Sequence, residues 1–139
     1  MERKYNYTFS ELLDRLSIVQ LKEMLIPDHK EEYAAEMAAI LSDIQSIIDT
    51  DAILINANTL RDLVVLAQIN AHIWHNEANY RKGIREGNSL ELTHGLNGIR
   101  NTAKNKITSA SVKCWGLSLL SSCSSYVVMR DCKRIDLAR

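Results

Sequence analysis

Helix-forming residues run through this chain with few interruptions, and this continuity limits the fold more than any other feature. The 139 residues include a single proline and five glycines, so the backbone has few places where a helix must break. Apolar residues recur at intervals of three and four, which places them on one face of a helix. The alternation typical of half-buried strands is missing from most of the sequence. We therefore predict an all-α fold, an antiparallel bundle of four to five helices with one long central helix.

Capping signals mark where these helices begin. Thr8 followed by Glu11 is the pattern of a capping box, and Pro27 ends the helix that it opens. The same spacing of a capping side chain and an acid recurs at three further starts, Asp28 with Glu31, Thr59 with Asp62 and Asn88 with Glu91. The expected helices cover residues 10–25, 28–51, 59–82 and 88–107. At 1.5 Å per residue the third is roughly 35 Å long, enough to cross the domain.

The length and the large apolar fraction predict one helical domain spanning residues 1–139. Residues 52–55 are expected to form a linker, and residues 83–87 a tight connection. The stretch 109–125 contains seven serines among seventeen residues, which fits either a continued helix and turn or a partly mobile segment. Residues 126–137 are compatible with a short closing helix.

The compartment follows from features that the sequence lacks. No run approaches the roughly 18 consecutive apolar residues that span a bilayer, and the first residues lack the apolar region of a signal peptide. Cys114, Cys123 and Cys132 form no C-x-x-C pair and have no histidines nearby at zinc-site spacing. We therefore expect a cytoplasmic protein with reduced cysteines that does not enter a membrane.

The formal net charge is zero but the charge is unevenly distributed. Residues 1–80 carry 6 Lys and Arg against 13 Asp and Glu, whereas residues 81–139 carry 11 against 4. This asymmetry either balances charge within the fold or across a subunit interface, or it prepares the basic half to receive an anion. The basic residues between Arg81 and Lys106 are dispersed, so a surface for duplex nucleic acid is not indicated.

Two polar helix faces form the candidate site. Residues three and four apart share one side of a helix. On the third expected helix these are Asn70, Trp74, Glu77 and Arg81, and on the fourth they are Asn97, Arg100, Asn101, Lys104, Asn105 and Thr108. The connection between the two helices is short, so they are expected to be antiparallel neighbours whose polar faces confront each other.

Such a pocket would suit a nucleotide or sugar phosphate. Arg100, Lys104 and Arg81 offer charge to a phosphate, the asparagines offer amides, and Trp74 or Tyr80 offers a ring for stacking. Gly95 and Gly98 cost stability inside a helix, so either a close neighbour or a bound group is expected beside them.

The alternative is a buried polar seam that fixes the register of the helices. In that interpretation Glu77 pairs with Arg81 and the asparagines bond across helices. Glu11 and Arg15 of the first helix are also spaced for an ion pair. If this helix packs beside the polar faces, Asp14 becomes a candidate partner for Arg100 or Lys104.

Signals for a metal or a catalytic group are weak. His72 and His75 are three residues apart on a helix, but neither His94 nor Glu77 completes a recognised metal spacing. The acids Glu31, Glu32, Glu36 and Asp43 resemble the acidic helices of all-α nucleotide pyrophosphohydrolases without reproducing their spacing. Phosphate-binding glycine loops and nucleophile motifs are absent from the sequence. We predict neither a metal nor a cofactor.

Three sequence patterns resemble a family of small helical proteins of unknown function found in phages and bacteria. They are Glu11-Leu-Leu-Asp-Arg-Leu-Ser-Ile18 with Leu21-Lys22, then Asn70-x3-Trp74-x2-Glu77-x3-Arg81, then Asn97-x2-Arg100-Asn101-x2-Lys104-Asn105-x-Ile107. The likeness covers residues 8 to 107, and the serine-rich stretch that follows departs from it. It implies a helical fold and the location of a site, without a chemistry.

The leading hypothesis is a small helical module that binds a phosphate-bearing, nucleotide-like molecule. If the chain is a phage protein, sequestering a nucleotide signal of host defence would suit it. The alternatives are a metal-dependent nucleotide hydrolase that uses Glu77 with acids of the first two helices, and a structural interaction protein. Self-association is expected in each case, because Leu63, Val65, Leu66 and Ile69 place apolar groups on more than one side of the longest helix.

Overall fold

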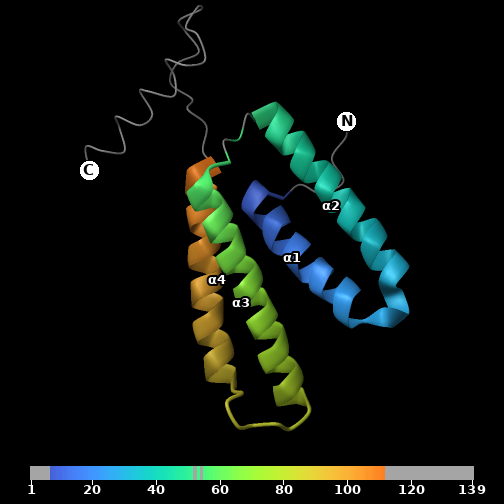
Figure 1. The fold of residues 1–139 in the computed structure, drawn as a ribbon. Helices are drawn as coiled ribbons and strands as arrows, with labels where there is room; N and C mark the ends of the chain where they lie inside the picture. Colours follow the sequence, from blue (N-terminus) through green and yellow to red (C-terminus); the bar gives the residue numbers. More distant parts are fainter. Residues whose placement is uncertain (1–6, 52, 54, 112–139) are drawn as a thin grey trace, which may run out of the picture.

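The computed structural model describes residues 7–51, 53 and 55–111, and they form four α-helices (Figure 1). These are α1 (Phe9–Leu25), α2 (Lys30–Asp51), α3 (Ala57–Arg81) and α4 (Leu90–Ser111), with a short 3₁₀ helix, η1 (Pro27–His29), between α1 and α2. No strand occurs in the described ranges, so the all-α prediction is confirmed. The residues beyond 111, including the expected closing helix, lie outside the described part of the chain.

The helices form two hairpins that meet at α1. The first hairpin is α1 with α2, and the second is α3 with α4, the 25 residues of α3 making the expected long helix. Among the described elements, α1 contacts all three other α-helices, whereas α2 packs on α1 and η1 alone. Figure 1 shows α1 lying between α2 and the α3–α4 pair. The way in which α1 meets α3 and α4 therefore decides how the two hairpins are joined.

Each helix contributes one completely buried aliphatic side chain to the apolar core. Leu12, Ile40, Leu66 and Ile107 come from α1, α2, α3 and α4 in turn, and each is fully shielded from solvent. Burying such a side chain stabilises a fold by about 1.5–3 kcal/mol. The core therefore ties all four helices together.

The helix ends agree with the sequence signals in some places and correct them in others. Thr8 and Glu11 form the expected capping box of α1. The N-cap of α3 is Asn56 and not Thr59, because the Asn56 side chain accepts the backbone N–H of Thr59. Ser89, and not Asn88, accepts the Leu92 N–H at the start of α4. The 3₁₀ helix displaces the expected start of α2 to Lys30.

Within the described residues, the helices lack the combination of length and apolar content that crossing a bilayer requires.

Candidate functional site

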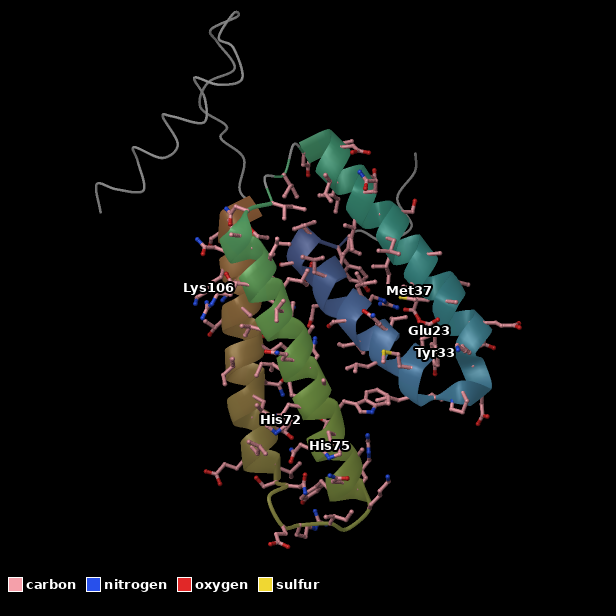
Figure 2. The ribbon with its side chains drawn as sticks, in the orientation of Figure 1. Glu23, Tyr33, Met37, His72, His75 and Lys106 are labelled. Atoms are coloured by element: carbon pink, nitrogen blue, oxygen red, sulfur yellow. The ribbon has the colours of Figure 1, made fainter. Side chains whose placement is uncertain are left out.

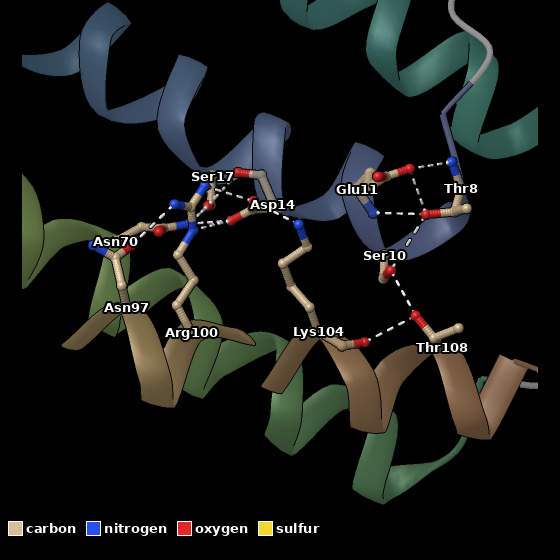
Figure 3. Close-up of polar contacts among 10 residues, drawn as sticks. All are labelled: Thr8, Ser10, Glu11, Asp14, Ser17, Asn70, Asn97, Arg100, Lys104 and Thr108. Carbon is tan, nitrogen blue, oxygen red and sulfur yellow. Dashed lines mark hydrogen bonds and ion pairs between the residues drawn. The ribbon is translucent and has the colours of Figure 1, made fainter. Parts of the chain in front are cut away.

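A stripe of buried polar side chains on α1 faces α3 and α4. Ser10, Asp14 and Ser17 are spaced at three and four residues, as the apolar core positions of the same helix are, and all three are buried. Buried polar groups need hydrogen-bond partners, because leaving one unpaired costs about 1–3 kcal/mol. The opposing helices supply those partners, and we call the resulting contact the polar seam. Its members are Ser10, Asp14, Ser17, Asn70, Arg100, Lys104 and Thr108 (Figure 3).

The Asp14 carboxylate is the centre of the polar seam. Arg100 of α4 binds it in a fork, with Nε 2.9 Å from Oδ1 and Nη2 2.7 Å from Oδ2. Lys104 Nζ lies 3.4 Å from the same Oδ2. Asn70 of α3 donates from Nδ2 to Oδ1 at 2.8 Å, and also to Ser17 Oγ at 2.7 Å. One carboxylate of α1 thus engages both helices of the second hairpin, as Figure 3 shows.

The surroundings of Asp14 keep its carboxylate charged. Burial by itself raises the pKa of Asp14, but hydrogen bonds from Arg100 and Asn70 and the charges of Arg100 and Lys104 outweigh that cost. The pKa therefore lies below its ordinary value. The Asp14 side chain is only 7% exposed, whereas those of Arg100 and Lys104 are 27% and 24% exposed. The cations thus cover a carboxylate that water barely reaches.

The contacts on either side of Asp14 set the register of α1 on α4. Ser10 and Thr108 share a hydrogen bond of 2.7 Å between their hydroxyl groups. Going forward along α1 from Ser10 to Asp14 corresponds to going backward along α4 from Thr108 to Lys104 and Arg100. The two helices are therefore antiparallel, and a shift by one turn would separate these pairs.

A second buried amide fastens α3 to the start of α4. Asn76 is 1% exposed, and its Nδ2 donates to the carbonyl oxygen of Ser89 at 2.9 Å and to Thr93 Oγ1 at 2.6 Å. The Ser89 N–H donates back to Asn76 Oδ1 at 3.1 Å. With its donors and its acceptor engaged, Asn76 closes the α3–α4 connection.

The structure gathers some of the residues predicted for a ligand site and separates the others. Asn70, Arg100 and Lys104 meet around Asp14, and Asn97 lies next to Arg100, with its Oδ1 3.4 Å from Nη1. The remaining predicted residues do not join them. Arg81, Asn101 and Asn105 are exposed, and Trp74 and Glu77 are half-buried without a hydrogen bond or ion pair to a described residue.

Two ion pairs that helical spacing allows do not form in the described part of the chain. Glu77 and Arg81 form no ion pair within the described part of the chain. Glu11 bonds Thr8 at 2.8 Å instead of pairing with Arg15. Helical spacing allows the Glu11–Arg15 pair, but the capping geometry gives Glu11 a closer partner and the neighbouring helix α2 gives one to Arg15.

Arg15 of α1 binds Glu36 of α2, with Nε 2.9 Å from Oε1. Tyr80 has the Arg85 guanidinium 3.6 Å from its ring centre. A ring predicted to stack on a ligand therefore stacks on a side chain of the next loop.

No described helix packs against the glycines of α4. A Cβ atom built at Gly95 or Gly98 would meet nothing within 4 Å in the described part of the molecule. The close neighbour expected beside them is therefore not found among the described residues. A bound group at these glycines stays a prediction.

Sequence reasoning placed Asp14 only as a conditional partner and missed Ser17, Asn76 and Thr93. The sequence did contain a signal for Asp14 and Ser17, because both lie at core spacing on an otherwise apolar helix face. A buried polar residue at a core position predicts a partner on another helix. The identity of that partner depends on packing, which the spacing leaves open.

Metal-ligating side chains do not gather in the described ranges, where no three His, Cys, Asp or Glu residues are close enough to hold an ion. His72 and His75 of α3, labelled in Figure 2, are both exposed to solvent. The described residues also line an open hollow at the α1–α2 connection, bounded by Glu23, Ala34 and residues 27–32. None of the predicted ligand residues lines that hollow.

Comparison with known proteins gives no match to a protein-family model, to a curated protein or to a solved structure. The likeness to small helical phage and bacterial proteins therefore stays a prediction.

Proposed function

We propose that the chain is a helical interaction module, which binds other proteins through its solvent-exposed surface. The observation that carries this proposal is the engagement of Arg100 and Lys104 by the buried Asp14 carboxylate. These are two of the three cations that sequence analysis assigned to a phosphate. In this structure they hold α1 on the α3–α4 hairpin, which is an architectural role.

A phosphate at this position would have to compete with an internal anion. The Asp14 carboxylate already occupies the planar fork of Arg100, the geometry that a phosphate would use. Displacing Asp14 would leave a buried charge without its partners, and breaking a buried pair costs about 3–5 kcal/mol. A ligand would have to recover that free energy before it gained any affinity.

The acids of the hydrolase alternative also have other roles. Asp14 is held by Arg100, Glu36 by Arg15 and Glu11 by Thr8. Glu77, the acid expected on α3, is not joined by two further potential metal ligands in the described part. The geometry therefore supports binding better than hydrolysis.

A phosphate-bearing ligand is the second candidate. Two cations share one carboxylate in the polar seam, and the Arg100 and Lys104 side chains are each about one-quarter exposed. The exposed part of the Arg100 and Lys104 side chains therefore carries an excess of positive charge, which a phosphate could neutralise without removing Asp14. Sequestration of a nucleotide signal by a phage protein is the special case of this candidate.

Thermal unfolding with and without ligand tests the proposal. Wild type and Arg100→Ala are melted in magnesium buffer alone, with inorganic phosphate, and with a panel of mono-, di- and cyclic nucleotides. We expect Arg100→Ala to lower the melting temperature and every nucleotide to leave both proteins unchanged. A ligand at about 100 times its Kd adds about 2.7 kcal/mol of stability, roughly 10 °C in a domain of this size. A rise of that order in wild type, abolished in Arg100→Ala, would contradict the interaction module and support the second candidate.

A further inference from the structure

Two connections at one end of the molecule carry opposite charges. The α1 helix is antiparallel to α4 through the polar seam, and α4 is antiparallel to α3, so the C-terminal ends of α1 and α3 point the same way. The α1–α2 and α3–α4 connections therefore lie at the same end, which is the lower end in Figure 1. We call residues 23–32 the acidic turn and residues 80–90 the basic loop.

The basic loop presents cations beside exposed apolar groups. Arg81, Lys82 and Arg85 are exposed and form no ion pair with a described residue, and Glu86 is the acid among them. Ile84 is 50% exposed in the middle of the loop. Leu90, which ends it, is 55% exposed. Exposed apolar side chains rimmed by polar and charged groups are typical of a surface that another protein covers.

The conformation of the basic loop is fixed by the chain itself. Gly83 and Gly87 have φ angles of 81° and 69°, the left-handed region that glycine adopts most readily. The hydrogen bonds between Asn76 and Ser89 hold the end of the loop against α3. A loop held in this way loses little conformational entropy when it docks.

The acidic turn offers the complementary surface. Its acids are Glu23, Asp28, Glu31 and Glu32, against which it carries Lys30 and His29. Met24 and Leu25 beside them are 72% and 56% exposed. Several of these residues surround the open hollow at the α1–α2 connection, which could receive a long cationic side chain.

The acidic turn is also fixed in place. Lys22 Nζ lies 5.8 Å from the centre of the Tyr33 ring, and this contact links the end of α1 to the start of α2. The ion pair between Arg15 and Glu36 joins the two helices further along. Figure 2 shows Tyr33 and Glu23 between the two helices.

We propose that two copies of the chain dock end to end, with the basic loop of each on the acidic turn of the other. This inference rests on the proposed function and names its partner surface. Because both patches lie at the same end, a two-fold axis between two copies brings each patch against its opposite and makes both contacts twice. Exposed ion pairs are individually weak, so the four apolar side chains supply the burial and the charges set the orientation.

A charge exchange tests the docking. One variant carries Arg81→Glu and Lys82→Glu, and the other carries Glu31→Lys and Glu32→Lys. We expect wild type to sediment as a dimer at about 100 µM in low salt and each variant alone to be a monomer, its dissociation constant raised about tenfold or more. An equimolar mixture of the two variants should restore the dimer. In the mixed dimer the reversed, now acidic loop of one variant faces the reversed, now basic turn of the other, and the native turn of the first faces the native loop of the second.

A third variant carries Lys82→Glu alone and should also weaken the dimer. Lys106→Glu is its matched control, because Lys106 is likewise an exposed lysine but lies near the other end of α4 (Figure 2). It should leave the dimer intact. Circular dichroism establishes that each variant remains helical. A monomeric wild type, folded variants that stay dimeric, or a mixture that stays monomeric would each overturn the docking. These outcomes are separate from the nucleotide result, which bears on the proposed function alone.

Discussion

At the scale of single residues, the burial of Asp14 sets the character of this protein. Carboxylates are seldom buried unless they are paired, and here an arginine fork, an amide and a lysine surround one. Removing one partner of such a group is more harmful than replacing the group entirely, because the remaining charge stays buried. Asp14 and Arg100 are therefore the residues whose substitution should be most informative.

Acid should weaken the fold through Asp14. Its pKa is lowered in the folded protein, so the stability it contributes is present above the unfolded pKa, near 4, and is lost as the pH falls through the lower folded value. We expect the melting temperature of wild type to fall more steeply below about pH 5 than that of Asp14→Asn.

Glu11→Gln is the control for the Asp14 experiment. Hydrogen bonds from Thr8 also lower the pKa of Glu11, but this carboxylate is exposed. Glu11→Gln should therefore reduce the acid-induced fall in melting temperature less than Asp14→Asn does. If the melting temperatures of wild type and Asp14→Asn fell in parallel as the pH is lowered, the role given to Asp14 would be contradicted.

At the scale of helices, the sequence predicted the elements well because their signals are local. Apolar spacing and the Thr8–Glu11 box located α1 to within a residue, and Pro27 marked its end. The start of α3 was placed too late, because Asn56 caps it in competition with Thr59. A cap is decided by which of two nearby polar side chains reaches the free N–H groups, and sequence spacing allowed either.

The candidate site was predicted less well because it depends on contacts between helices. Spacing correctly placed Asn70 on one face of α3 and Arg100 and Lys104 on one face of α4. It could not tell that α1 would bring Asp14 between them. The polar faces of α3 and α4 therefore meet through a third helix, and Arg81 remains exposed.

Glycine substitutions should have opposite effects in α4 and in the basic loop. Gly95→Ala and Gly98→Ala should each raise the free energy of unfolding by about 0.5–1 kcal/mol, because both sites are helical and open. Gly83→Ala should lower it by about 1–2 kcal/mol, because its φ is positive. Urea unfolding measures all three. Destabilisation by Gly95→Ala or Gly98→Ala in a folded variant would show that an unseen group packs on this face of α4.

At the scale of the whole molecule, two hairpins of unlike charge are joined through one helix. The described residues of the α1–α2 hairpin carry ten acids against three Lys and Arg, whereas α3, α4 and the loop between them carry seven Lys and Arg against four acids. Among the described helices, the backbone of α2 comes close to α1 but not to α3 or α4, so the two hairpins are joined mainly through α1. The central claim is that Asp14 and Arg100 hold this junction together.

A double-mutant cycle on Asp14 and Arg100 tests that claim most directly. The free energy of unfolding is measured in urea for wild type, Asp14→Ala, Arg100→Ala and the double variant, with Arg15→Ala and Glu36→Ala as the control cycle. Each single change at the junction should cost about 3 kcal/mol, and the coupling energy should be about 2–3 kcal/mol, against less than about 1 kcal/mol for the more exposed control pair. Additive effects of Asp14→Ala and Arg100→Ala, with no measurable coupling, would contradict the account.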